Sequence, residues 1–162
     1  MINRKVWIGW GSMLLCFCMA CGPVYDKVNL STFLPGDWQN IQMEVALTTV
    51  NGSDSNSVFS ADEATWEQVL RIQPILTNYN TDSSYVSEYL DLFGNRIKKF
   101  TGRWSVKGDS LIHKQLQPIP ATHRFEVKVR HNKAFFKGTI DFDQDGEVDD
   151  VYQATQRKLD NS

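Results

Sequence analysis

The segment Arg124-Phe125-Glu126-Val127-Lys128-Val129-Arg130 decides the fold class, because apolar and charged side chains alternate along it at every second position. A period of two is typical of a β-strand that turns one face to a core and the other to water. After a turn near residues 131–133, a return strand carries four small or apolar residues on one face: Ala134, Phe136, Gly138 and Ile140. Together the two segments predict an antiparallel hairpin.

The same pattern recurs along most of the chain. Residues 41–47 alternate in the same way, and apolar segments over residues 85–92, 97–106, 111–116 and 148–159 are separated by short polar turns. The count is about eight strands in succession, which is typical of an antiparallel meander closed into a barrel. No alternation of strands and helices supports a parallel sheet. We therefore predict an all-β fold, an up-and-down barrel of about eight strands.

Residues 51–74 interrupt this regular pattern. The polar residues 51–60 predict a loop. The sequence Ser60-Ala-Asp-Glu63 has the form of a helix capping box, whereas residues 66–72 also fit a strand that stops at Pro74. We expect a turn of helix followed by a strand.

The N-terminus has the layout of a secretory signal. Arg4 and Lys5 precede a mostly apolar run over residues 6–20, which is too short for a comfortable membrane span. The run ends in Ala20-Cys21-Gly22, which resembles the cleavage and lipidation box of bacterial lipoproteins, although Cys18 stands where leucine is usual. The alternative is an ordinary signal peptide or an uncleaved anchor helix. The resemblance implies a signal peptide over residues 1–20 and lipid on Cys21. The residues that follow show little periodicity, so we expect a tether over residues 21–33 and a barrel domain over residues 34–162.

Cysteine usage and charge restrict the chemistry. All three cysteines lie within the first 21 residues, so cleavage before Cys21 leaves no disulfide, catalytic thiol or thiolate metal site. The formal net charge is -2, with 17 basic and 19 acidic residues, and no basic stripe in the sequence favours nucleic acid. The sequence also lacks a nucleophile elbow, a phosphate loop and a zinc-protease helix, so we expect a protein that is not an enzyme.

A family resemblance comes from short motifs spread over residues 34–159. Gly36-Asp-Trp38 looks like the Gly-x-Trp signature of lipocalins, in which the tryptophan plugs one end of an eight-stranded barrel under a basic side chain. Arg157, or alternatively Lys158, would supply that cation. Residues 100–111 resemble the central hairpin of bacterial lipocalin-like lipoproteins, whereas the family's threonine-aspartate signature has only a loose counterpart at Thr81-Asp82. The resemblance implies a lipocalin-like barrel.

The stretch from Asp141 to Asp150 is a candidate calcium loop. Six carboxylates fall within ten residues, and alternate aspartates lead into Gly146 as in calcium-binding turns. Tyr152 stands where an EF-hand has its bidentate carboxylate, so any calcium would be held in an acidic β-turn. The alternative is a soluble hairpin turn without an ion. The candidate ligands are Asp141, Asp143, Asp145, Glu147 and Asp149.

The three histidines do not predict a metal site. His123 and His131 share the parity of Phe125 but lie about 26 Å apart along a strand, and His113 stands alone in the preceding hairpin.

Two functions are consistent with this sequence. The first is an exported lipoprotein, anchored through Cys21 to a membrane of the bacterial cell envelope, expected to be the outer membrane, with a barrel that binds a small apolar ligand. The second is a non-catalytic envelope module with a filled barrel and a structural calcium loop, which meets a partner protein. An internal cavity of roughly 300 Å³ or more would favour the first.

Overall fold

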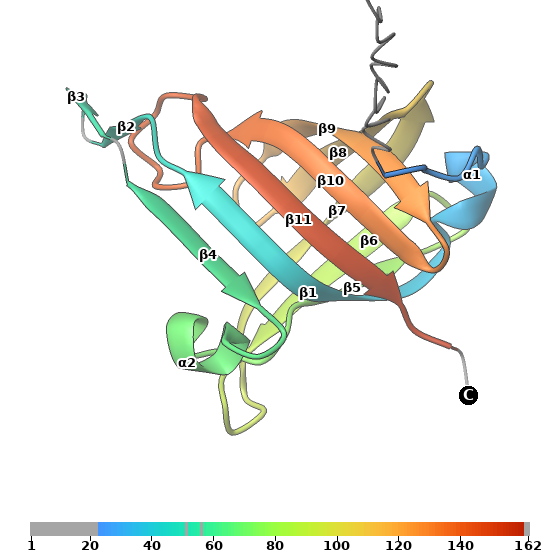
Figure 1. The fold of residues 1–162 in the computed structure, drawn as a ribbon, viewed down its shortest axis with the longest axis horizontal. Coiled ribbons are helices and arrows are strands. Elements are labelled where there is room, and N and C mark those ends of the chain that lie inside the picture. The colour runs from blue at the N-terminus through green and yellow to red at the C-terminus, as the bar shows by residue number, and fades with distance from the viewer. Residues whose placement is uncertain (1–22, 51, 56, 161–162) are drawn as a thin grey trace, which may run out of the picture.

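The protein forms one closed antiparallel barrel in a computed structural model that describes residues 23–50, 52–55 and 57–160 (Figure 1). The strands pair in the order β11-β10-β9-β8-β7-β6-β5-β1, and β11 returns to pair with β1. Their bounds are β1 (Gly36–Ala46), β5 (Leu76–Tyr79), β6 (Ser84–Leu90), β7 (Arg96–Lys107), β8 (Ser110–Gln117), β9 (Ala121–Arg130), β10 (Lys133–Ile140) and β11 (Asp150–Lys158). The predicted all-β barrel of about eight antiparallel strands is confirmed.

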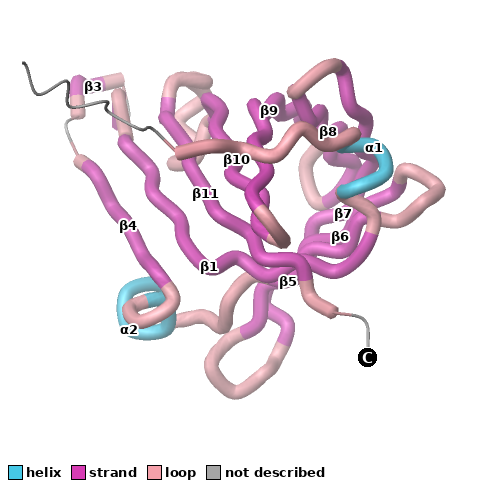
Figure 2. Tube along the Cα trace, turned by 45° about the vertical axis from the view of Figure 1, so that its right-hand side comes forward, coloured by secondary structure: helices cyan, strands magenta, loops and turns pink. Residues whose placement is uncertain are grey.

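One wall of the barrel is interrupted by an insertion. One edge of β1 pairs first with β5 and then with an additional strand, β4 (Val58–Asp62). Gln42 lies opposite Asp62, so an unbroken partner strand would place Thr65 opposite Gln39, whereas the observed partner is Leu76. Eleven extra residues therefore separate the two halves of this wall. They carry the helix α2 (Trp66–Leu70), which lies beside the end of β4 (Figure 2).

The helix within this insertion begins later than the capping-box pattern indicates. It occupies residues 66–70, where the sequence predicts a strand, and the next strand, β5, begins only at Leu76. Ser60 lies in β4, and the residue that precedes the helix is Thr65. The turn is instead held by Asp62, whose Oδ1 accepts hydrogen bonds from Ala64 N, Thr65 N and the Thr65 hydroxyl. The other short elements are α1 (Leu30–Phe33) and the hairpin of β2 (Thr49–Val50) and β3 (Ser53–Asp54).

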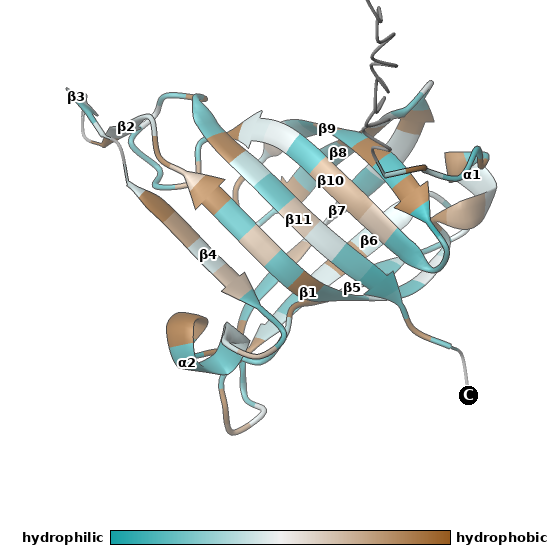
Figure 3. Cartoon of the chain, viewed as in Figure 1, coloured by the Kyte–Doolittle hydropathy of each residue, from teal (hydrophilic) through white to brown (hydrophobic). Residues whose placement is uncertain are grey.

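The barrel interior contains two apolar clusters, and the alternation of hydrophilic and hydrophobic residues along β1, β11 and β10 is visible in Figure 3. The larger cluster lies at the end that α1 covers, where Trp38, Leu34 and Leu111 are fully buried. The smaller cluster lies around α2, whose Trp66 packs with Met43 and other residues of β1 and β4. Burial of each large side chain contributes about 1.5–3 kcal/mol to folding.

The two ends of the barrel differ in their access to solvent. At the α1 end the inward-facing side chains are buried, as the first cluster shows. At the other end several inward-facing side chains stay partly exposed: Tyr89, His113, His123, Ile140 and Tyr152. The residues 141–149 stand at the rim of this second end, which we call the open end.

The described N-terminal segment is fastened to the outside of the barrel. The Tyr25 ring packs edge-on against Phe135 of β10, at 5.5 Å between ring centres, and Asp26 N donates to Val129 O of β9 at 2.7 Å. The helix α1 then buries Leu30 over the barrel end. Part of the expected tether over residues 21–33 therefore packs on the domain. In the part of the chain that the structure describes, no helix has both the length and the apolar composition needed to cross a membrane.

Candidate functional site

The α1 end of the barrel is closed by Trp38 and a lysine. Trp38 is fully buried, and its indole Nε1 donates to Leu34 O at 2.7 Å. Lys158 Nζ lies 5.5 Å from the centre of the Trp38 ring and 5.1 Å from that of Phe33, and it also donates to Phe33 O. Burial lowers the pKa of Lys158, which nevertheless keeps a strong acceptor in Phe33 O. This end is therefore a structural plug.

Arg157 does not supply the cation over Trp38. Its side chain points outward, where Nη1 lies 2.8 Å from Glu63 Oε1 and Nη2 donates to Gln39 at 3.2 Å. Successive residues of a strand point to opposite faces, so the inward place belongs to Lys158. Gly36 serves the same contact, because a Cβ there would lie 3.0 Å from Lys158 Cε and its φ of +129° disfavours other residues.

A layer of aromatic rings crosses the barrel interior at mid-height. His113 stacks on Tyr85 with ring centres 4.4 Å apart, and Phe125 lies 5.5 Å from His113 and 5.7 Å from Tyr152. These residues come from β6, β8, β9 and β11, so the layer connects opposite walls. We call this group the aromatic layer: Tyr79, Tyr85, His113, Phe125 and Tyr152.

Polar side chains line the interior beside this layer, and some of their atoms are unpaired. Gln156 Nε2 donates to Asn40 Oδ1 at 2.9 Å, and Gln156 Oε1 is buried without a hydrogen-bond partner. Asn40 Nδ2 is buried without a partner at hydrogen-bond geometry, although the Asn40 side chain lies near enough to Tyr152 to oppose the rise in its pKa. His113 Nε2 is buried and unpaired in the same way. An unsatisfied buried polar group costs about 1–3 kcal/mol. By contrast, Thr77 and Ser87 satisfy each other at 2.8 Å.

The titrating side chains of the aromatic layer and of its neighbour Tyr89 are neutral near pH 7. Burial lowers the pKa of His113 to about 3, and burial raises the pKa of Tyr85 and of Tyr152 to about 12. Burial also raises the pKa of Tyr79 and Tyr89. Because the aromatic layer offers no charged side chain, it suits an uncharged ligand.

Two hollows in the described residues lie outside this interior. One of about 260 Å³ lies on the outer wall of β1 and β9–β11, beside Tyr25. The other, of about 610 Å³, lies between α1, the β5–β6 turn and β7, beside Trp104. Neither is lined by the open-end residues Tyr89, His123 or Tyr152, so neither is the internal cavity that would favour the ligand-binding function.

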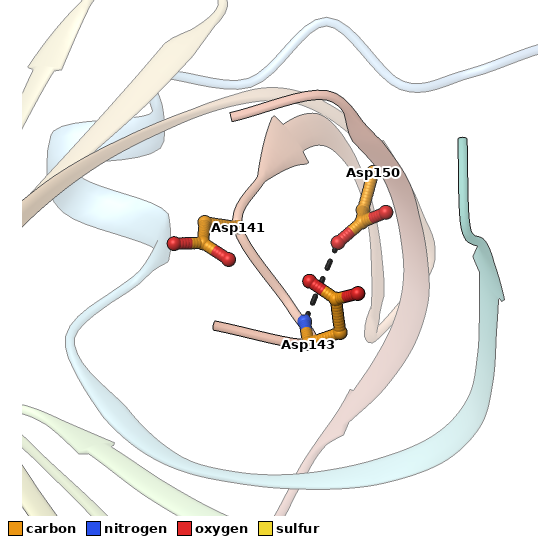
Figure 4. Close-up of side chains that lie close together, drawn as sticks. All are labelled: Asp141, Asp143 and Asp150. Carbon is orange, nitrogen blue, oxygen red and sulfur yellow. Dashed lines mark hydrogen bonds between the residues drawn. The ribbon is translucent and has the colours of Figure 1, made fainter. Parts of the chain in front are cut away.

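The acidic loop gathers three carboxylates at the rim of the open end. One oxygen from each of Asp141, Asp143 and Asp150 lies within 4.8 Å of the others (Figure 4). Asp150 is fully buried and holds the loop, because its Oδ2 accepts from Phe142 N at 2.8 Å and its Oδ1 accepts from Thr48 N at 3.3 Å. Asp141 Oδ1 and Asp143 Oδ2 are shielded from solvent and accept no hydrogen bond.

The rest of the predicted ligand set is arranged differently. The Thr49 hydroxyl donates to Asp149 Oδ2 at 2.9 Å and lies 3.3 Å from Asp145 Oδ2, with which it can share the same proton. Glu147 is exposed, and its backbone N donates to Asp145. Desolvation raises the pKa of Asp143, and the neighbouring carboxylates add to this effect. Oxygen ligands at this spacing suit a hard cation such as calcium.

The predicted lipidation site, Cys21, lies outside the described residues, which begin at Pro23. Sequence reasoning missed Asn40, Gln156 and the inward orientation of His113. For His113 the signal existed, since it has the parity of Leu111, which is fully buried. Asn40 and Gln156 gave no signal, because polar residues in a strand ordinarily face water.

The geometry thus defines a closed, lipocalin-like antiparallel barrel with one plugged end and one open end. No family model matches the chain, and no curated protein matches it. Among solved structures, the chain is similar to a lipocalin-like protein from Bacteroides uniformis, with a TM-score of 0.45 and 15% identity over 78% of this chain and 99% of the other. The assignment of the fold rests on the strand order and closure described above.

Proposed function

We propose that this chain is an exported, non-catalytic lipoprotein of the bacterial cell envelope, held by lipid on Cys21, expected in the outer membrane, whose barrel takes up a small apolar ligand. The observation that supports ligand uptake is the set of unpaired polar atoms on Asn40, Gln156 and His113 beside the aromatic layer. A mostly apolar wall with a few polar groups is typical of small-molecule sites.

The chemistry of this wall limits the ligand. Asn40 Nδ2 donates and Gln156 Oε1 accepts, so the ligand would offer one acceptor and one donor close together. His113 and the interior tyrosines are neutral, so the ligand needs no charged group to pair with them. The ligand is therefore a small, uncharged, largely apolar molecule with a polar edge, entering from the open end past Tyr89 and His123.

The test of ligand uptake compares two double substitutions of inward-facing residues. Asn40→Leu with Gln156→Leu removes the unpaired atoms, so the empty protein should become no less stable while binding of a labelled fatty alcohol weakens by about tenfold. Thr77→Val with Ser87→Ala removes a satisfied pair and serves as the control, which should lower stability and leave binding unchanged. If a buried water is the natural partner, the labelled probe will not bind the unaltered protein at all, and the proposal of a ligand fails.

The anchor is tested separately. When the full chain is expressed in a bacterial host, the mass of the N-terminal peptide should equal that of residues beginning at Cys21 plus acyl groups. Cys21→Ser should abolish both this mass and the fractionation with membranes, whereas Cys18→Ser should change neither. An N-terminus at any other residue would contradict lipidation at Cys21.

We further propose a structural calcium ion at Asp141, Asp143 and Asp150. The supporting observation is the approach of the three carboxylates, with shielded oxygens on Asp141 and Asp143 that accept no hydrogen bond. Like charges this close repel each other unless a cation intervenes. Such an ion would fasten the β10–β11 connection at the rim of the open end.

A further inference from the structure

The outer face of strands β7 to β10 carries a concentration of positive charge. Inward residues such as Trp104, Leu111, Phe125 and Phe136 fix the parity, so the residues between them point outward. Between residues 103 and 137, eight outward positions of these strands are basic, and we call this surface the basic wall: Arg103, Lys107, Lys114, Arg124, Lys128, Arg130, Lys133 and Lys137. The outward positions of these strands between residues 103 and 137 include one acidic residue, Glu126.

The charge of this wall differs strongly from that of the chain as a whole. The whole sequence has a net charge of -2, so the eight bases on one face, out of 17 in total, represent a separation of charge. Seven of the eight are exposed, and Lys133 is half-buried. Lys128 is paired with Glu126 at 3.0 Å. In the sequence, residues 124–130 already show a charged outward face, but the other basic residues join it only where the strands lie side by side in the fold.

Two pairs of like charges lie directly opposite each other within the basic wall. Arg103 is the cross-strand partner of Lys114, and Arg130 is that of Lys133. Like charges in directly opposed positions destabilise a sheet, whereas Thr or Ser there would not. Arg103 Nη1 also donates to Asp82 O at 2.8 Å, whereas Lys114, Arg130 and Lys133 form no ion pair within the described residues. Three of these four charges are therefore free to meet an anionic partner.

The described chain begins on the same wall. Tyr25 packs on Phe135 of β10, and Lys128 Nζ lies 5.6 Å over the Tyr25 ring. Cys21 precedes Tyr25 by four residues, which span at most about 14 Å when fully extended. This step rests on the proposed function: if Cys21 is lipidated, the anchor holds the basic wall within reach of lipid headgroups.

We infer that the basic wall docks on the membrane that anchors the protein, by contact of its lysines and arginines with anionic phospholipid headgroups. The barrel then lies with its side against the membrane, and its open end stays accessible along the membrane surface. Each basic residue near an anionic surface strengthens binding by about fivefold. Exposed Leu116 and Ile119, next to the wall at the β8–β9 turn, add apolar contact at the headgroup level.

The decisive experiment uses the full chain with Cys21→Ser, so that binding does not depend on an acyl chain. Flotation with phosphatidylcholine vesicles that contain phosphatidylglycerol should carry the protein, and pure phosphatidylcholine should not. Lys114→Gln, Arg124→Gln and Lys137→Gln together should weaken this binding by about a hundredfold. The control, Arg71→Gln, Arg96→Gln and Lys98→Gln, removes the same charge from the end of α2 and the start of β7, outside the basic wall, and should change the binding little.

A second experiment tests, in the acylated protein, whether the basic wall lies against the membrane. A dye on Thr122→Cys, an exposed β9 position, should be quenched by a headgroup quencher in anionic vesicles, whereas a dye on Val58→Cys of β4 should not. High salt should relieve the quenching, because the Debye length falls from about 10 Å at 0.1 M to about 3 Å at 1 M. Equal quenching at both sites would overturn the inference while leaving lipidation intact. Binding to duplex DNA in place of anionic vesicles would also overturn it.

Discussion

Lys158 lies across the indole of Trp38, with Nζ 5.5 Å from the ring centre, and closes the α1 end of the barrel. The contact depends on Gly36, since a Cβ there would approach the lysine stem to 3.0 Å. A cation over tryptophan contributes about 0.5–2 kcal/mol, more when water is excluded. The hydrogen bond to Phe33 O also ties α1 to the last strand. The plug is thus one unit made of the first strand, the last strand and α1.

Replacing Lys158 by Met should destabilise the protein by about 1–3 kcal/mol, because the cation–π contact and the bond to Phe33 O are both lost. Arg157→Met is the matched control on the opposite face. Its ion pair with Glu63 is partly exposed, so its loss should cost less than about 1 kcal/mol. Urea unfolding measures both values. If Arg157→Met proves the more damaging change, the cation–π contact of Lys158 is not what closes the barrel.

Acid should unfold the protein partly through His113. Its pKa is about 3 in the folded state, because its Nε2 is buried within the aromatic layer although the residue is partly exposed, against about 6.5 when unfolded. As the pH falls, the imidazole of His113 therefore binds a proton in the unfolded chain before it does so in the folded one. The stability that His113 contributes is complete above about pH 6.5 and is lost as the pH falls from there toward 3, by up to about 1.4 kcal/mol per pH unit.

His113→Phe should flatten this dependence, because phenylalanine fills the same layer without titrating. Between pH 7 and pH 5 the variant should lose about 1–2 kcal/mol less than the unaltered protein. Leu111→Ala, at the neighbouring inward position, is the control: it should lower stability by about 2–5 kcal/mol equally at each pH. Parallel curves for His113→Phe and the unaltered protein would contradict the buried neutral histidine. His123 titrates in the same direction and leaves a residual slope.

The helix α2 should be essential to the smaller apolar cluster. Trp66 is 1% exposed, so Trp66→Ala should cost about 3–5 kcal/mol. Trp66→Phe should cost far less, because the indole Nε1 has no hydrogen-bond partner to lose. Val69→Ala on the exposed face of the same helix should stay within about 0.5 kcal/mol. Urea denaturation of the three variants measures these values. Equal, small losses for all three would mean that the helix only covers the surface and does not pack in the core.

The barrel was predictable because strands such as β9 repeat with a strict period of two. The insertion between β4 and β5 was not, since Trp66, Leu70 and Ile72 fit both a helix and a strand. The choice between Arg157 and Lys158 depends on a single residue of register, and a bulge between Asn40 and Gln42 shifts β1 against β11. Register of this kind is set by partner strands far away in the sequence. The basic wall likewise exists only once four strands lie side by side.

Calcium should raise the melting temperature of the protein if it binds between Asp141, Asp143 and Asp150. For a dissociation constant on the order of 10⁻⁴ M, a hundredfold excess of free calcium stabilises by about 2.7 kcal/mol, which amounts to several degrees. Asp143→Asn should remove most of this gain. In chelator the same change should raise the melting temperature, because it relieves repulsion among the carboxylates. Asp109→Asn, in the exposed β7–β8 turn, should leave the calcium response intact. Identical melting in calcium and chelator would leave Asp150 as the sole organiser of the loop, through its bonds to Phe142 N and Thr48 N.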